Sequence, residues 1–152
     1  AGGRVLLGSA GAAASRAALQ DAGVTHILCV ARGLGAWFPG EFEHRTVEVD
    51  DRPGEDLGVH FAATTAWISA ALLASPDHRV LVHCFRGKSR SAAVVAAYLI
   101  STTGCSVEDA MARIRAARPQ AQPNLGFCAQ LRRFHREVAA AEGPGEEKSH
   151  DT

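Results

Sequence analysis

The chain lacks an excess of charge of either sign. Its 16 lysines and arginines balance its 16 aspartates and glutamates, so the formal net charge is +0 over 152 residues. A neutral total argues against general binding to nucleic acid or to an anionic membrane, although a local basic pocket is compatible with it. No apolar run approaches the roughly 20 residues that a membrane-spanning helix requires. We therefore expect no nucleic-acid partner and no membrane span.

Paired cysteine spacing and histidine ligand spacing are also missing. The four cysteines, Cys29, Cys84, Cys105 and Cys128, form no CxxC motif, and a domain of this length has a core that needs no disulfide. The seven histidines show no HxxxH or similar pattern, so we expect no metal and no other cofactor. We expect the protein to be located in a reducing compartment, namely the cytoplasm and also the nucleus.

Strand-like and helix-like patterns alternate along the chain. Short β-branched or apolar runs predict strands at residues 4–8, 24–31, 44–49 and 79–83. Alanine-rich or amphipathic stretches predict helices at residues 9–22, 57–75, 92–100, 106–118 and 124–138. This order predicts one α/β domain over residues 1–141 with a mostly parallel sheet flanked by helices. Residues 142–152 are rich in Gly, Glu and Ser and are expected to be a disordered tail.

The strongest functional signal is the segment that joins the apolar run 80–82 to the apolar helix 92–100. It reads His83-Cys84-Phe85-Arg86-Gly87-Lys88-Ser89-Arg90-Ser91. A loop that turns from a strand into a helix points its N–H groups toward a common centre, which makes a cradle for an anion. Gly87 allows a ligand to approach the backbone, and Arg90 offers a planar pair of donors to phosphate oxygens. We predict that phosphate binds to Phe85, Arg86, Gly87, Lys88, Ser89 and Arg90.

Cys84 lies at the start of this cradle. A single cysteine is more often a buried structural thiol than a nucleophile, but the same positive field that binds phosphate lowers the pKa of a thiol. The CxxGxxR arrangement therefore favours a thiolate that attacks phosphorus, with Arg90 stabilising the phosphoryl oxygens. Ser91 is expected to donate to the thiolate, or only to cap the helix. His83 is expected to be buried and to bond to the loop.

A proton donor for the leaving oxygen must come from outside this positive loop. The segment Asp50-Asp51-Arg52-Pro53-Gly54-Glu55-Asp56 follows a predicted strand, and sites in parallel sheets lie at the carboxyl ends of strands. A carboxyl group there can serve as general acid and then as general base. The alternative is that these acidic residues form an ordinary solvated loop with no part in catalysis.

At these residues the sequence resembles the cysteine-dependent dual-specificity phosphatases of the protein tyrosine phosphatase superfamily. The loop matches their His-Cys-x-x-Gly-x-Ser-Arg-Ser signature, and the similarity continues over roughly residues 4–140, for example at Ala97-Tyr98-Leu99-Ile100 and at Pro123-Asn124. The resemblance implies a five-stranded sheet, no metal, a phosphocysteine intermediate and a small atypical member. It also implies that Asp51, not Asp50, is the general acid, and that Asn124 supports the site as a helix N-cap.

Two residues depart from the family pattern. Cys29 occupies a position where the family usually has an asparagine that braces the site. The sequence leaves undecided whether Cys84 forms a disulfide with one of the other cysteines. Arg86 replaces the usual alanine and adds positive charge beside Lys88. We expect phosphotyrosine and phosphoserine/phosphothreonine in proteins as substrates. The alternatives are a phosphoinositide or inositol (pyro)phosphate substrate and, in another class, a non-catalytic phosphopeptide-binding module. The sequence does not define the oligomeric state.

Overall fold

The computed structural model describes residues 3–143, and within them four strands form one parallel sheet. The strands are β1 (Val5–Gly8), β2 (His26–Val30), β3 (Glu43–Val47) and β4 (Val80–His83). Their order across the sheet is β1-β4-β2-β3, and every neighbouring pair is parallel. The α/β class and the parallel sheet are confirmed.

The five-stranded sheet that the resemblance implied is not found in the part of the chain that the structure describes. Residues 31–42, between β2 and β3, contain no strand, and their one sheet-like contact is an isolated bridge between Pro39 and Phe42. Pro39 has no N–H for a ladder, and Gly33 and Gly40 adopt positive φ values of 78° and 83°. This segment therefore forms a loop.

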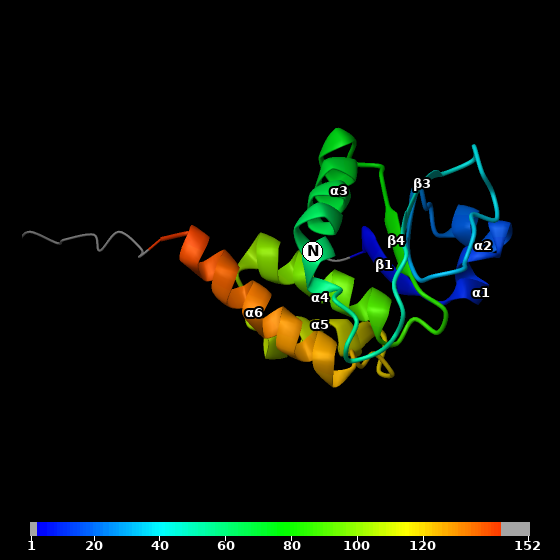
Figure 1. Ribbon diagram of the computed structural model, residues 1–152. Coiled ribbons are helices and arrows are strands. Elements are labelled where there is room, and N and C mark those ends of the chain that lie inside the picture. The colour runs from blue at the N-terminus through cyan, green and yellow to red at the C-terminus, as the bar shows by residue number, and fades with distance from the viewer. Residues whose placement is uncertain (1–2, 144–152) are drawn as a thin grey trace, which may run out of the picture.

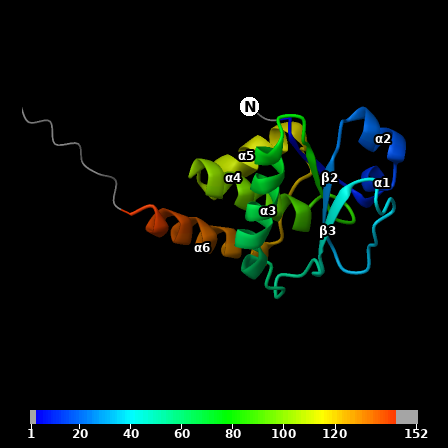
Figure 2. The same cartoon turned by 90° about the horizontal axis from the view of Figure 1, so that it is seen from above.

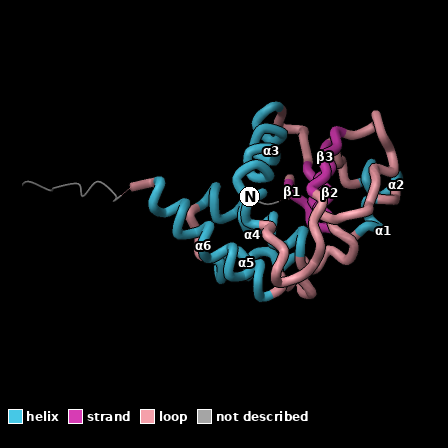
Figure 3. Tube along the Cα trace, in the orientation of Figure 1, coloured by secondary structure: helices cyan, strands magenta, loops and turns pink. Residues whose placement is uncertain are grey.

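Helices cover the two faces of the sheet unequally (Figures 1, 2 and 3). The short helices α1 (Ala10–Ala13) and α2 (Arg16–Asp21) lie on one face. The helices α3 (Phe61–Ala74), α4 (Arg90–Thr103), α5 (Val107–Ala117) and α6 (Leu125–Ala141) lie on the other. A turn of 3-10 helix, η1 (Gly58–His60), leads into α3.

The larger core lies between the sheet and helices α3–α6. Leu28, Val30, Val80 and Val82 point from the central strands into this layer, where α4 is buried on almost every side. Ile27 and Leu81 alternate to the opposite face and pack against Leu19 of α2 in a smaller cluster. The predicted central, buried helix after the cysteine loop is therefore confirmed, and it holds that loop against the sheet.

Two predicted boundaries differ from those observed. The helix expected over residues 9–22 is divided at Ser15, whose side chain accepts a hydrogen bond from Ala18 N and so begins α2 as an N-cap. At the other end, α6 continues to Ala141, and residues 144–152 of the predicted tail lie outside the described residues.

Candidate active site

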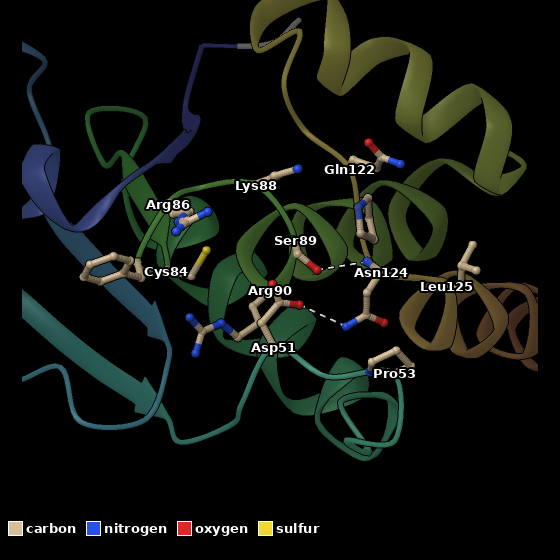
Figure 4. A pocket seen from close by; sticks show the side chains of 12 residues that line it. Asp51, Pro53, Cys84, Arg86, Lys88, Ser89, Arg90, Gln122, Asn124 and Leu125 are labelled. Carbon is tan, nitrogen blue, oxygen red and sulfur yellow. Dashed lines mark hydrogen bonds between the residues drawn. The ribbon is translucent and has the colours of Figure 1, made fainter.

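The site lies at the carboxyl edge of the sheet, where two loops face a common pocket. Because all four strands are parallel, the loops that follow β3 and β4 leave the sheet at the same edge. We call residues 83–91 the phosphate loop and residues 50–56 the acid loop. Both line a pocket of about 490 Å³ with the segment 122–125 (Figure 4). The lining residues are Asp51, Pro53, Cys84, Phe85, Arg86, Lys88, Ser89, Arg90, Gln122, Pro123, Asn124 and Leu125.

Cys84 lies in this pocket with only 2% of its surface exposed. Burial alone would raise the pKa of this thiol. The Ser91 hydroxyl and the N–H groups of Ser91, Gly87 and Lys88 donate to the sulfur and lower the pKa below the ordinary value. The Ser91 Oγ to Cys84 Sγ distance is 3.1 Å. The arrangement thus stabilises a thiolate with fixed dipoles.

The carbonyl groups of the phosphate loop explain why its N–H groups face the sulfur. Each carbonyl from residue 84 to residue 89 accepts a hydrogen bond, and all of the donors except His83 lie outside the loop. The donors, in order, are His83 Nδ1, Ala10 N, Arg118 Nη2, Arg118 Nε, Gln122 N and Ala93 N. The N–H and C=O of a trans peptide point in opposite directions, so turning the carbonyls outward turns the amides inward.

Gly87 is required for a reason that the sequence analysis did not reach. Its φ is 65°, and a Cβ there would lie 2.5 Å from the carbonyl oxygen of Gly8 and 2.8 Å from Arg118 Nη2. We predicted that this glycine gives room to a ligand. The structure adds that it gives room to the residues behind the loop.

The first turn of α4 leaves its amides available to the site. Ser89 is the N-cap residue, but its side chain makes no capping bond and instead accepts a hydrogen bond from Asn124 N at 2.9 Å. The positive end of a helix favours an anion at this place. Arg90 begins α4 and donates from Nη1 to Val49 O at 2.9 Å, which places its guanidinium at the pocket. Arg86 and Lys88 are exposed at the pocket lining.

Asp51 and Asp50 lie in different surroundings. Asp51 lines the pocket, and its Oδ1 accepts a hydrogen bond of 2.9 Å from Asn124 Nδ2 (Figure 4). Asp50 does not line the pocket, and its carboxylate pairs with Arg52 and Arg32. Asn124 also caps α6, because its Oδ1 accepts from Phe127 N. One asparagine therefore connects the acid loop, the phosphate loop and α6.

His83 and Cys29 are buried next to Cys84. Burial lowers the pKa of His83, which favours the neutral ring, and its Nδ1 donates to Cys84 O at 3.3 Å. Among the described residues, the buried Nε2 of His83 has no hydrogen-bond partner. Cys29 is fully buried in a small cluster with Cys84 and Ala31, and burial raises its pKa to about 11. Cys29 is therefore a neutral thiol, and both cysteines are free.

Several residues of the site had no role predicted from the sequence. Pro53, Gln122, Pro123 and Leu125 line the pocket, and Arg118 holds two carbonyls of the phosphate loop. Gly126 is also essential to the shape, since a Cβ there would lie 1.9 Å from Pro53 O. The similarity at Pro123-Asn124 was the available signal for this wall. Arg118 and Gly126 belong to the same similar stretch, but the sequence did not identify the groups that they contact.

The described part of the chain has neither a metal-ligand cluster nor a membrane-spanning helix. Residues 3–143 contain no cluster of three or more His, Cys, Asp or Glu side chains placed to hold a metal ion. No helix in that range is long and apolar enough to cross a membrane.

Comparison with known proteins agrees with this geometry. Residues 5–137 match the family model "Dual specificity phosphatase, catalytic domain". The chain is 37% identical to dual specificity protein phosphatase 1B of Arabidopsis thaliana over 134 residues, which cover 88% of this chain and 79% of that protein. It is 42% identical to dual specificity phosphatase 28 of Homo sapiens over 137 residues, or 90% and 76% of the two chains. The crystal structure of human DUSP28 superposes with a TM-score of 0.87 at 37% identity, covering 92% of this chain and 96% of that one.

These matches define a cysteine-dependent phosphatase of the protein tyrosine phosphatase superfamily. The chain belongs to the dual-specificity phosphatase family, as an atypical member, and is a protein phosphatase.

Proposed function

We propose that this phosphatase hydrolyses phosphotyrosine and phosphoserine/phosphothreonine in proteins through a phosphocysteine intermediate on Cys84. The Cys84 thiolate attacks phosphorus, a sulfur–phosphorus bond forms, and the bond to the leaving oxygen breaks. Arg90 and the amides of residues 85–90 bind the phosphoryl oxygens while negative charge develops on them. The carboxylic acid of Asp51 gives its proton to the leaving oxygen.

The second step restores the enzyme. The Asp51 carboxylate takes a proton from water, the water oxygen attacks phosphorus, and the sulfur–phosphorus bond breaks to release inorganic phosphate. Ser91 donates to the departing thiolate, as its position 3.1 Å from the sulfur permits. The observation that carries the proposal is the convergence of Ser91, Gly87 and Lys88 donors on a buried thiol whose pKa is lowered.

The basic lining of the pocket favours one second candidate. Arg86 and Lys88 line the pocket mouth beside Arg90, and several positive charges suit a polyanionic substrate such as a phosphoinositide or an inositol (pyro)phosphate. A non-catalytic phosphopeptide-binding module is disfavoured, because nucleophile, arginine and carboxyl group all face the same pocket.

A catalytic thiol needs reducing surroundings. We therefore expect the protein in the cytoplasm and also in the nucleus.

Cys84→Ser tests the mechanism. We expect the variant to lose turnover of an aryl phosphate completely and to retain binding of a phosphate mimic that forms no covalent bond to sulfur, such as sulfate, because the cradle remains while the nucleophile is lost. A C84S protein that still turns over the aryl phosphate contradicts the proposed nucleophile.

A substrate panel tests the choice between the two candidates. Phosphotyrosine, phosphothreonine and phosphoinositide substrates are compared on the wild type and on Arg86→Ala. We expect both phosphopeptides to be preferred, with kcat/KM on them changed little by R86A. A preference for the lipid that R86A abolishes would favour the second candidate.

A further inference from the structure

The phosphate loop is held from behind by a residue that its signature does not include. Arg118 follows α5 and forms the C-cap of that helix, 34 residues after Cys84 in the chain. Its Nε donates to Gly87 O at 2.8 Å, and its Nη2 donates to Arg86 O at 3.0 Å. A planar guanidinium thus binds two successive carbonyls with its fork of donors.

The two peptide groups that Arg118 holds are the ones that donate to the sulfur. The carbonyl of Arg86 shares a peptide group with the N–H of Gly87, and the carbonyl of Gly87 shares one with the N–H of Lys88. Those two N–H groups act on Cys84 as donors that lower the pKa of its thiol. Each peptide group therefore lies between a fixed positive charge at its oxygen and the sulfur at its nitrogen.

This arrangement acts on the sulfur in two ways. A cation at a carbonyl oxygen polarises the peptide and strengthens its N–H as a donor. The fork also fixes the orientation of both peptide planes, and hydrogen bonds weaken when their angles depart from linear. The other loop carbonyls before α4 accept from backbone amides or from the neutral His83, so Arg118 supplies the charged contacts on this side.

We propose that Arg118 is a positioning residue that tunes the Cys84 thiolate through the 86–87 and 87–88 peptide groups. The proposal rests on Cys84 as the nucleophile of the proposed function. Arg118 itself touches the carbonyl side of the loop, not the sulfur. Its contribution is to hold the oxyanion-binding amides in place before a phosphate enters.

The reactivity of Cys84 toward iodoacetamide, measured against pH, tests this without any phosphatase assay. In Arg118→Gln the charge is lost, and we expect the midpoint of alkylation to rise by about one pH unit. In Arg118→Lys the charge remains but the fork is lost, so we expect a smaller rise. Arg113→Gln is the matched control, because it removes an exposed arginine from the same α5 helix and should leave the midpoint in place.

The remaining titratable and charged groups around Cys84 are unchanged in all three variants. They are Cys29 from β2, His83 from β4, Arg90 from α4, Asp51 from the acid loop, and Arg86 and Lys88 from the phosphate loop. R118Q also removes the direct effect of a nearby positive charge on the thiolate. A midpoint shift in R118K, where the charge is kept and the fork to the two carbonyls is lost, therefore reports the peptide groups between Arg118 and the sulfur.

The outcomes separate the proposal from a purely structural role. An unchanged midpoint in R118Q, with only a lower unfolding temperature, overturns it, as does an equal shift in R113Q. If R118Q does not fold, R118K decides alone, since an unchanged midpoint in that variant also overturns the proposal. A wild type that alkylates at low pH but hydrolyses no phosphate ester would contradict the proposed function while leaving the role of Arg118 intact.

Discussion

The phosphate loop and the acid loop face the same pocket, but the protein holds them differently. In the phosphate loop every carbonyl from residue 84 to residue 89 accepts a hydrogen bond, and Cys84 is buried. In the acid loop Asp51 is exposed, and Asn124 donates one hydrogen bond to it. The rest of that loop is fixed by Gln130, which donates to Glu55 O, and by Glu55, which accepts from Asp50 N.

The difference follows from the tasks that we assign to the two loops. Amides that stabilise a thiolate and a phosphoryl group must be oriented before the reaction, since reorienting them would cost free energy at the transition state. A general acid must lose and regain a proton in each cycle. Asp51 is exposed at the pocket lining, where its carboxyl group is in contact with the water that takes part in each cycle.

Removing the general acid should distinguish the functions of the two loops most strongly. We expect Asp51→Ala to lower turnover by about 10²-fold or more, least for substrates with good leaving groups, with an unchanged pH midpoint for alkylation of Cys84. Steady-state kinetics on aryl phosphates of different leaving-group pKa would measure this. Asp50→Ala is the matched control, and a larger loss in D50A than in D51A would place the acid one residue earlier.

A substitution at the contact between the acid loop and α6 should have the next largest effect. Gly126→Ala brings a Cβ against Pro53 O, where 1.9 Å is available, so we expect a loss of about 1–3 kcal/mol in the free energy of unfolding and a lower turnover. Denaturant unfolding measures the first and aryl phosphate hydrolysis the second. Gly11→Ala in α1 is the matched control, because its Cβ would meet only Ser9 Oγ at 3.6 Å. Wild-type stability in G126A would contradict the close contact between Gly126 and Pro53.

The two serines of the phosphate loop should give the smallest and most specific effects. Ser91 donates to the sulfur, so Ser91→Ala should raise the pKa of Cys84, which lies below the ordinary 9.0 in the wild type. The thiolate then forms at higher pH, and the alkylation midpoint moves up by about one unit. Ser89 bonds to Asn124 N instead, so S89A should leave the midpoint in place. Equal shifts in the two variants would contradict this division.

The sequence predicted the phosphate loop well because its chemistry is local. A strand, a glycine and an arginine at fixed spacing from a cysteine determine how amides converge, and the central helix α4 follows from its own apolar pattern. The position of Asp51 relied on the resemblance to a family, and the structure places it in the pocket. Its role as general acid stays a prediction.

The residues whose roles the sequence did not predict act across long separations. Arg118 bonds to residues more than 30 positions earlier, and Gly126 meets Pro53 of a distant loop. An arginine or a glycine of this kind has the same local pattern as any surface residue, since its role depends on which segment the fold brings beside it. The fifth strand that the resemblance implied is not found in the described residues. The residue patterns themselves predicted four strands, at the places where the structure has them.

The phosphocysteine itself provides the most direct test of the account. Asp51→Ala is mixed rapidly with an aryl phosphate that has a good leaving group, quenched in acid and digested for mass spectrometry. The first step then needs little help from an acid, whereas the second step lacks its base, so the intermediate should accumulate. We predict one phosphoryl group on the peptide that contains Cys84. Turnover that proceeds with the phosphoryl group on another residue, or with no phosphorylated enzyme at all, would contradict the account.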